Sequence, residues 1–591
     1  MKIIYTVFTL LLCNSIFAQL TVRNSAYVYV TNEVLFVEDD VDIMESNSYL
    51  YLRDGSQLLQ GTGTSGNNGI GKLSVYQSGT VHQAAYNYWC SPVGNVLSND
   101  SNNRSFKANN QLYDVTSAPI TSSLATYTTG YDGTSSPLVI ASYWLWTYNP
   151  GILYSEWDQV LETGDVATGY GFTMKGTSGS GNNQLYDFRG KPNNGTIFTS
   201  ISNGQDTLIG NPYPSALDAL EFIHKPANIP LIDSGTLYFW EQDLSTTSHA
   251  LVNYRGGYAS YTINSVGTIE TFIPATFDSY NPDGTLNAGG SASASGKAVY
   301  RYIPIGQGFM VRGSGNGQTR TTNAMRKYEK EAASVSEFFR TNGNTTNHLR
   351  TDALTYTDDG LQIIPEDYMR FRINVDFNET YTRQLLQNFH YSATNDKDYG
   401  LESRSPELIS SDAHWDQDGE PYSAQAFNFN VDLRIPLIVN IDEQQLVRFR
   451  IFDIQNFDDS QSIYIHDIEN EVYIDLRVQD YELTLPVGDF NTRFEIVFTS
   501  ESLSVDDIVF NDFEVFQNNS TSELTILNPN QLEIKNISLF DVSGKLIFNE
   551  INLPIQSNYK FSTKNLSDGV YITKVTLDTN QGLNKKVIVS N

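Results

Sequence analysis

Residues 369–377 read MRFRINVDF, a stretch in which apolar and polar side chains alternate without a break. Met369, Phe371, Ile373, Val375 and Phe377 share one parity. Because successive side chains of a β-strand point to opposite faces of a sheet, this period of two predicts a strand with one apolar face. Residues 427–435 and 447–451 follow the same pattern, and residues 493–498 read as a further strand. Together these stretches predict antiparallel sheets packed as a β-sandwich over residues 348–500.

The chain before this region also consists of short apolar runs between polar turns. In residues 19–80 the runs recur every ten to fifteen residues or so, which fits either one edge of a solenoid or the meander of a sandwich. Residues 81–323 contain three features twice in the same order: a Pro-containing loop, an aromatic strand and a Gly-x-Gly-Phe strand entry. These features lie at residues 91–92, 143–146 and 169–172, and again at 211–212, 237–240 and 306–309. We therefore predict two related β-sandwich lobes.

Residues 324–347 interrupt this pattern with the clearest helical composition in the chain. Alanines occur there together with charged side chains such as Lys327, Glu331 and Glu337. Charges of both signs along one segment are typical of a solvated helix. We expect a helix or linker here, ending in a boundary rich in Asn and Thr.

Residues 510–591 form a small, self-contained β-module by their pattern. In the DVSGK stretch at residues 541–545, Asp and Ser can bond their own backbone and Gly accepts positive φ, which predicts a hairpin. A second turn leads into the strand that begins GVY at residue 569, and two lysines precede a final apolar run. The residues that carry these signals are Asp541, Gly544, Lys545, Gly569, Val570, Tyr571, Lys585 and Lys586.

This order of motifs resembles the C-terminal type A sorting domain of the bacterial type IX secretion system. The family's pattern has an I-x-L-x-D-x-x-G-K hairpin, an L-x-x-G-V-Y strand and a basic-apolar tail, all of which this sequence keeps. It departs at the start, where FQNN at residues 516–519 stands in place of Tyr-Pro-Asn-Pro. The resemblance covers roughly the last 75 residues. It implies passage across the outer membrane by the type IX machinery, followed by release or attachment to surface lipopolysaccharide.

The N-terminus predicts export as well. Residues 1–18 have a positive start at Lys2, an apolar core and a small residue before the expected cleavage point, which together predict a signal peptide. That core is too short to span a bilayer, and no later run is long enough, so we expect no transmembrane segment. The mature protein would be secreted or attached to the outer cell surface. Its one remaining cysteine, Cys90, lies in an aromatic run that favours a buried, inert thiol.

Charge and motif content narrow the functional classes. The formal net charge of −30 disfavours binding to nucleic acid. The sequence contains no nucleophile elbow, zinc-binding His-Glu-x-x-His or phosphate loop, and its seven histidines are scattered, so we predict no enzyme. Glycoside hydrolysis stays open because 67 acidic residues inevitably contain pairs of carboxylates.

Two groups of residues are candidates for binding. Asp396, Asp398, Asp416 and Asp418 lie in acidic loops whose alternating oxygen ligands and glycine turns suit calcium, the one cofactor that the sequence brings into question. The alternative is a pair of solvated turns, since turns favour Asp. Trp144, Trp146, Trp157 and Trp240 are candidates for a saccharide platform, because flat rings stack on sugar faces. The alternative for each tryptophan is packing in a core.

The sequence as a whole predicts an all-β protein. We expect tandem β-sandwiches, partly solenoid at the N-terminus, and a small C-terminal β-sandwich sorting domain. The expected role of residues 19–500 is adhesive or structural at the cell surface. Partners would be the type IX machinery and surface lipopolysaccharide, glycans or other cell-surface proteins. The alternatives are a polysaccharide-binding, lectin-like module and, after it, a glycan hydrolase.

Overall fold

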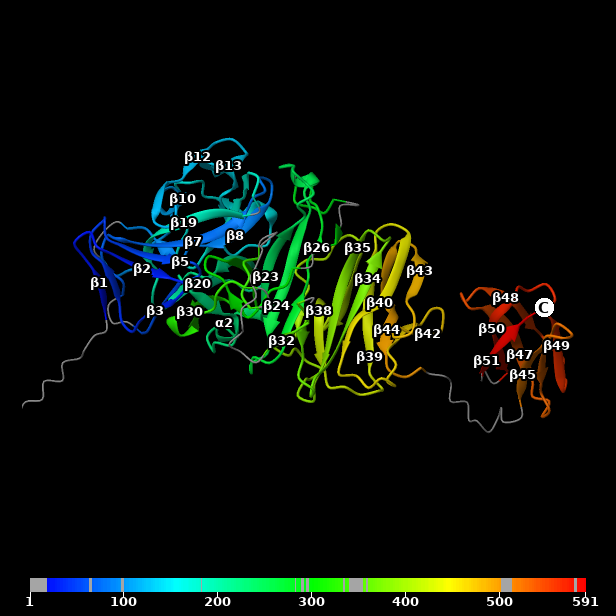
Figure 1. Cartoon of the computed structure of the whole chain (residues 1–591). Helices are drawn as coiled ribbons and strands as arrows, with labels where there is room; N and C mark the ends of the chain where they lie inside the picture. The colour runs from blue at the N-terminus through cyan, green and yellow to red at the C-terminus, as the bar shows by residue number, and fades with distance from the viewer. Residues whose placement is uncertain are drawn as a thin grey trace, which may run out of the picture. The chain divides into compact units, whose positions relative to one another are not determined.

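The computed structural model confirms the all-β prediction (Figure 1). It describes residues 19–62, 66–96, 100–181, 183–281, 283–287, 292–293, 297–332, 335–339, 354–357, 360–500, 513–578 and 582–590. Within these residues the α-helices are α1 (Ala108–Gln111) and α2 (Ala219–Ile223), each about one turn long. The chain divides into two compact units, residues 1–498 and 499–591. The predicted signal peptide, residues 1–18, lies outside the described residues.

The N-terminal strands form a parallel solenoid, one of the two arrangements that the sequence left open. Strands of one coil pair in parallel with those of the next, β1 with β4, β2 with β5 and β3 with β6. Leu20 pairs with Val41 and Val34 with Gln57, so one coil takes 21 to 23 residues. The strands are β1 (Leu20–Val22), β2 (Tyr27–Thr31), β3 (Val34–Val37), β4 (Val41–Ile43), β5 (Tyr49–Arg53) and β6 (Gln57–Gln60).

The solenoid shares a sheet and a core with the segment that follows it, so residues 19–80 are not a separate domain. Strand β7 (Lys72–Thr80) pairs in parallel with β5 and antiparallel with β19 (Asn183–Pro192), and the sheet continues into β10 (Leu112–Ser117) and β11 (Thr121–Leu124). Figure 1 shows these strands side by side. Leu50 and Leu52 of the solenoid join Trp89 and Phe188 in one apolar core.

The predicted repeat in residues 81–323 is visible in the strand pairing. In the first copy β8 pairs with β17, which pairs with β15 and then β16. In the second copy β21, β29, β23 and β24 pair in the same order, and β25 follows β24. Bridges between Trp89 and Gln307 and between Tyr170 and Ile209 join the first strand of each copy to the Gly-x-Gly-Phe entry of the other. The strands are β8 (Tyr86–Cys90), β15 (Trp146–Thr147), β16 (Asp158–Gln159), β17 (Gly171–Lys175), β21 (Asp206–Gly210), β23 (Ile232–Gln242), β24 (Gly256–Ile263), β25 (Glu270–Ile273) and β29 (Gly308–Gly313).

Shorter elements complete this part of the chain. They are β9 (Val93–Gly94), β12 (Thr126–Thr128), β13 (Gly133–Ser135), β14 (Leu138–Ala141), β18 (Thr177–Ser178), β20 (Ile197–Ile201), β22 (Ala216–Asp218), β26 (Thr276–Phe277), β27 (Ala292–Ser293), β28 (Tyr302–Ile303), β30 (Gly317–Thr321), β31 (Arg326–Lys327), β32 (Thr355–Tyr356) and β33 (Gln362–Ile363). Four 3₁₀ turns join them, η1 (Ser142–Trp144), η2 (Tyr154–Glu156), η3 (Leu251–Asn253) and η4 (Asn323–Met325).

For residues 324–347 the sequence predicts a helix or a linker, and the helix alternative is wrong for the part that the structure describes, residues 324–332 and 335–339. After η4 the chain runs extended, and β31 pairs with β22. The Arg326 guanidinium is buried and donates to the Ser215 hydroxyl and the Leu58 carbonyl. Further on, Phe338 and Phe339 are buried and the Phe339 N–H donates to Gln307. These tertiary contacts override the local helical propensity.

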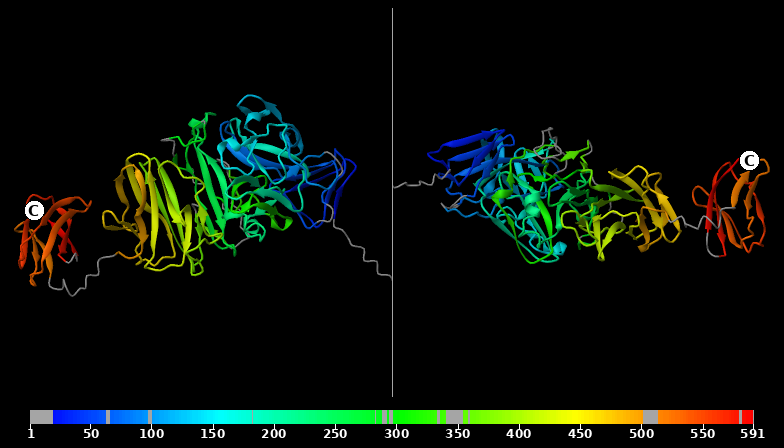
Figure 2. Two further views of the ribbon diagram at one scale, coloured as in Figure 1. Left: turned by 180° about the vertical axis from the view of Figure 1, so that it is seen from behind. Right: turned by 90° about the horizontal axis from the view of Figure 1, so that it is seen from below.

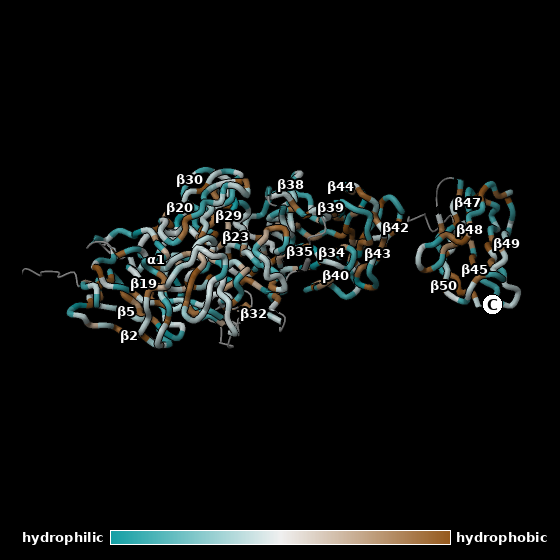
Figure 3. The backbone as a smooth tube through the Cα atoms, turned by 90° about the horizontal axis from the view of Figure 1, so that it is seen from above, coloured by the Kyte–Doolittle hydropathy of each residue, from teal (hydrophilic) through white to brown (hydrophobic). Residues whose placement is uncertain are grey.

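Residues 369–497 form one eleven-stranded sheet that nearly closes on itself around an apolar core. Its order is β42-β41-β44-β39-β37-β38-β35-β34-β40-β43, with β36 paired to β38. The pairing of β35 with β38 is parallel, so the predicted sheet is not wholly antiparallel. These strands lie side by side in both views of Figure 2, and Figure 3 shows apolar and polar residues alternating along them. They are β34 (Met369–Phe377), β35 (Tyr381–Phe389), β36 (Ser403–Arg404), β37 (Asp412–Gln417), β38 (Glu420–Phe427), β39 (Arg434–Ile441), β40 (Gln445–Gln455), β41 (Tyr464–Asp467), β42 (Val472–Asp475), β43 (Tyr481–Leu485) and β44 (Gly488–Val497).

The polar face of β34 is buried as completely as its apolar face. Arg370 is 0% exposed and donates to the Glu270 carbonyl at 2.8 Å. Arg372 is 2% exposed and donates to the Phe272 carbonyl at 2.8 Å. Strand β25, which carries both carbonyls, therefore lies against this face. The barrel-like sheet and the second lobe belong to one compact unit for this reason.

Residues 513–590 form the small C-terminal β-sandwich that the sequence predicts. One sheet has the order β45-β46-β49 and the other β48-β47-β50-β51, all antiparallel. Leu524 of the first sheet and Leu539 and Tyr571 of the second share one core. The strands are β45 (Glu514–Asn518), β46 (Glu523–Leu527), β47 (Ile534–Asp541), β48 (Leu546–Ile551), β49 (Asn558–Ser562), β50 (Gly569–Leu577) and β51 (Gly582–Val589).

Candidate functional site

The four predicted tryptophans lie among tyrosines at the junction of the two repeats. Trp157 and Trp240 both contact Tyr88, with ring centroids 6.0 Å away in each case. Trp144 contacts Tyr86 at 5.9 Å, and Trp146 lies half-buried on the next turn of chain. Trp144 ends the 3₁₀ turn η1 whereas Trp146 begins β15, so the two do not share one strand face.

We define the tryptophan cluster as Trp144, Trp146, Trp157 and Trp240 together with Lys175, His249 and Asp132. Lys175 covers the Trp144 ring. Lys175 Nζ lies 3.4 Å from the centroid of the Trp144 ring and 3.2 Å from His249 Nδ1. The His249 ring stacks on Trp144, and His249 Nε2 bonds Asp132 at 2.8 Å. Burial lowers the pKa of Lys175 to about 7, against the weaker opposing charge of Asp132. Trp144 is 7% exposed, so it offers no open ring face to a sugar.

A second aromatic surface, which the sequence interpretation missed, covers the outer face of the solenoid sheet. Register places Tyr27, Tyr49 and Lys72 in one row across β2, β5 and β7. The next rows contain Tyr29 with Tyr51, and Arg53 with Tyr76, and they extend onto β19 and β10. We call this surface the tyrosine face. It consists of Tyr27, Tyr29, Thr31, Tyr49, Tyr51, Arg53, Lys72, Ser74, Tyr76, Tyr113, Asp187 and Arg189.

Its outer edge is open to solvent. Tyr27 is 59% exposed and Tyr29 38% exposed, while Tyr49 is half-buried. Tyr49 stacks on Tyr51 with ring centroids 5.2 Å apart, and Tyr27 meets Tyr51 edge-on at 5.8 Å. Rings held in this way present both apolar surface and phenol hydroxyls.

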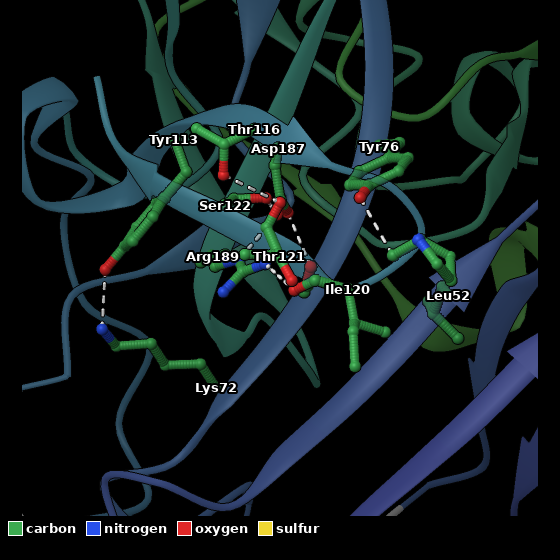
Figure 4. Close-up of polar contacts among 12 residues, drawn as sticks. Leu52, Lys72, Tyr76, Tyr113, Thr116, Ile120, Thr121, Ser122, Asp187 and Arg189 are labelled. Atoms are coloured by element: carbon green, nitrogen blue, oxygen red, sulfur yellow. Dashed lines mark hydrogen bonds and ion pairs between the residues drawn. The ribbon is translucent and has the colours of Figure 1, made fainter. Parts of the chain in front are cut away.

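The inner part of the face is a buried polar network (Figure 4). The Asp187 carboxylate, 0% exposed, accepts hydrogen bonds from the Ser74 and Ser122 hydroxyls at 2.6 and 2.7 Å and from Arg189 Nε at 2.6 Å. Lys72 Nζ donates to the Tyr113 hydroxyl at 2.7 Å. The Arg53 guanidinium stacks on Tyr76 at 3.6 Å. The network fixes the cations beneath the rings.

A sequence signal for this face exists in retrospect. Tyrosines alternate at positions 27 and 29 and again at 49 and 51, one solenoid coil apart. The other members come from residues 113 and 187–189, and nothing local connects them to the solenoid. Only the solenoid assignment would have placed the two tyrosine pairs side by side.

A pocket of about 290 Å³ is lined by the turns that follow β2 and β5, by residues 75–77 of β7, and by residues 304–305 and 329–331. The Gln77 amide, which lines it, donates to the Ile305 carbonyl at 2.7 Å and to Glu331 at 2.6 Å. The Gln57 amide donates to the Glu329 carbonyl. Both amides thus hold the second lobe against the solenoid, and the pocket is at the small end for ligand sites, roughly 300–1,000 Å³. The tyrosine face is the stronger candidate.

The acidic loops are turns with local roles. Asp398 accepts a hydrogen bond from the Thr394 N–H at 2.7 Å, inside its own loop, near Asp396. Asp418 and Gly419 have φ of +56° and +79° and form the two-residue turn between β37 and β38, which follows the exposed Asp416. No group of three or more His, Cys, Asp or Glu side chains within the described ranges is placed to hold a metal ion. The geometry of these four aspartates therefore gives the calcium hypothesis no support.

The predicted sorting motif folds locally as its sequence indicates. Asp541 Oδ1 accepts hydrogen bonds from the Ser543 and Lys545 N–H groups at 2.9 and 3.0 Å, and Gly544 has φ of +79°. The Tyr571 ring is 7% exposed, and its hydroxyl donates to the Ser567 carbonyl at 2.9 Å. Gly569 and Val570 open β50, while Lys585 and Lys586 are exposed on β51. The hairpin and the strand are confirmed; a sorting role stays a prediction.

The cysteine agrees with a further expectation, and the helices can be compared with what a membrane span requires. Cys90 is fully buried, and burial raises the pKa of its thiol, as expected of an inert side chain. In the described part of the chain, none of the helices combines the length and apolar character needed to cross a bilayer.

Comparison with known proteins identifies the family of this chain. No curated protein matches the sequence. Residues 503–589, which cover the C-terminal β-sandwich, match a family model described as a domain of unknown function (DUF8694). Residues 6–498 match another, described as a domain of unknown function (DUF8693). Since this second match spans most of its length, the chain belongs to the DUF8693 family.

Proposed function

We propose that this chain is an exported β-protein that acts outside the cell or on its surface, in an adhesive or structural role, and that it holds polysaccharide on its tyrosine face. The open rings of Tyr27 and Tyr29 support the binding part of the proposal. Tyrosine rings stack on the apolar faces of sugars while their hydroxyls bond the sugar edges. Two open rings along β2, with the half-buried Tyr49 beside Tyr27 on the parallel strand β5, suit an extended chain better than a small molecule.

The same proposal assigns residues 499–591 to export by the type IX secretion system. Its support is the resemblance of the DVSGK hairpin, the GVY strand and the basic-apolar tail to the type A sorting domain. The division of the chain at residue 498 is compatible with a module that can be removed after passage.

Binding to polysaccharide panels tests the first part. The full chain with Tyr27→Ala and Tyr29→Ala together should bind about 5- to 150-fold more weakly, because each stacked ring contributes roughly 0.5–1.5 kcal/mol. Tyr391→Ala is the matched control, since this ring is 75% exposed in the turn that follows β35 of the barrel-like sheet. Equal binding by the double variant and the control would show that the face is not the site. Release of reducing ends would indicate a hydrolase instead.

Deletion of residues 499–591 tests the export part. The truncated protein should be retained inside the cell envelope, with an unchanged circular dichroism spectrum for the remaining unit. If it reached the surface as the full chain does, the sorting assignment would be wrong, whatever the tyrosine face binds.

A further inference from the structure

We propose that the polysaccharide held by the tyrosine face is acidic, with carboxylate or sulfate groups on its sugars. The inference rests on the proposed function and adds the class of ligand. Its basis is that the tyrosine face contains more cations than carboxylates, and that the hydrogen bonds of its buried cation Arg53 go to neutral acceptors.

The residues that define the face carry three cations and one carboxylate. Arg189 and Asp187 form an ion pair with 6% and 0% of their side chains exposed. The Asp187 carboxylate also accepts hydrogen bonds from the Ser74 and Ser122 hydroxyls. Arg53 and Lys72 therefore have no carboxylate partner within the face.

Arg53 is the less usual of the two. It is 2% exposed, and its hydrogen bonds go to neutral acceptors, the Leu52, Ser74 and Pro119 carbonyls and the Ser74 hydroxyl. Desolvation by burial lowers the pKa of Arg53, while Asp187 opposes that shift. Burying a charge without a carboxylate in direct contact costs free energy, which the more distant Asp187 offsets only in part. An anionic group bound above the rings would offset that cost.

Lys72 supplies the reachable donor. It is half-buried in the same row as Tyr27 and Tyr49, and one of its three ammonium protons goes to the Tyr113 hydroxyl. Its remaining protons are available to a carboxylate or sulfate on a sugar that stacks beside it. Hydrogen bonds between charged groups are roughly twice as strong as neutral ones.

The net charge of −30 on the whole chain opposes the approach of a polyanion. Distant acidic residues act weakly, however, because the Debye length at physiological ionic strength is about 8 Å. Cations on the face itself lie within that range of a bound sugar. Recognition should therefore depend on these local cations and weaken with added salt.

A matched pair of polymers tests the inference with the full chain. Polygalacturonate and its methyl ester share one backbone and differ in free carboxylates, and dextran sulfate and dextran form a second pair. We expect at least one charged member to bind about tenfold more tightly than its neutral partner. Lys72→Gln should reduce that preference to below about threefold, whereas Lys225→Gln, a half-buried lysine of the second lobe, should leave it unchanged.

The outcomes separate this inference from the proposed function. Equal, tyrosine-dependent binding to both members of each pair, or an unchanged preference in Lys72→Gln, would overturn the inference and leave polysaccharide binding intact. Binding to the neutral polymers alone would also overturn the inference and leave polysaccharide binding intact. If no polymer bound in a way that Tyr27→Ala with Tyr29→Ala weakens, the proposed function itself would fail. Equal binding to single-stranded DNA would show a general polyanion site and overturn the polysaccharide assignment.

Discussion

Two aromatic surfaces in residues 19–498 combine rings with basic side chains, yet one is closed and the other open. In the tryptophan cluster, Lys175 and His249 cover Trp144, which is 7% exposed. On the tyrosine face, Tyr27 is 59% exposed. Composition therefore does not distinguish a packed aromatic group from a binding surface.

The difference comes from what lies beside each surface. His249 and Trp240 belong to the second copy of the repeat, which packs across Trp144 and Tyr88 of the first. Strand β2, by contrast, is the last strand of its sheet, so Tyr27 and Tyr29 have a paired strand on one side alone. An edge position leaves rings exposed that a central position would cover.

Truncating a closed ring should have the largest effect. Trp144→Ala removes a buried ring together with its contacts to Lys175, and we expect a loss of about 3–5 kcal/mol in the free energy of unfolding. Chemical denaturation followed by tryptophan fluorescence measures it. Tyr143→Ala, on a 39% exposed neighbour, is the control and should cost much less. Similar losses for both would mean that the cluster is not closed.

The boundary between closed and open rings should run through the tyrosine face itself. Tyr51 is 6% exposed, so Tyr51→Ala should cost about 2–3 kcal/mol, whereas Tyr27→Ala should change stability by about 0.5 kcal/mol or less. Thermal melts of the two variants make the comparison. A loss as large for Tyr27 as for Tyr51 would show that the outer ring is part of the packing.

The buried amine of Lys175 should make stability depend on pH. Its pKa is about 7 in the folded chain and near 10.5 when unfolded, so between these values the unfolded chain binds more protons and stability rises with pH. The ring faces favour the charged form and reduce this gain, which we expect to be about 1–2 kcal/mol. Lys175→Met should remove the rise between pH 7 and 10. Parallel pH profiles for both proteins would contradict the assignment.

Lys175, His249 and Asp132 contact one another in that order, and a substitution of Asp132, the outermost of the three, should have the smallest effect on stability. Asp132 has 57% of its side chain exposed, so water screens its contact with His249. We expect Asp132→Asn to lower the free energy of unfolding by about 0.5 kcal/mol or less, which thermal melts would show as a slight decrease in melting temperature. A loss as large as that of Trp144→Ala would mean that the contact between Asp132 and His249, and not the ring packing, keeps the cluster closed.

The local pattern of the sequence was enough to predict much of the fold. Strict alternation at residues 369–377 predicted strand β34, and Asp541 with Gly544 predicted the C-terminal hairpin. Both predictions succeeded because side-chain direction and turn geometry depend on neighbouring residues. The order of motifs in the repeat reappears as the order of strand pairing. The helix expected after residue 324 failed because distant groups, such as the Ser215 hydroxyl, hold Arg326 in an extended segment.

By itself, then, the sequence determined that this chain is all-β, where many of its strands and turns lie, and that its C-terminal module is distinct. The tertiary structure alone decided which faces are covered. Alternation shows that Arg370 and Phe371 point in opposite directions, but not that both are buried: Arg370 is covered by β25, about a hundred residues away in the chain, and Phe371 by the core of the barrel-like sheet. The tyrosine face likewise joins residues 27, 49, 72, 113 and 187 across four strand pairings. Periodicity is a property of neighbouring residues, whereas exposure depends on everything that packs against them.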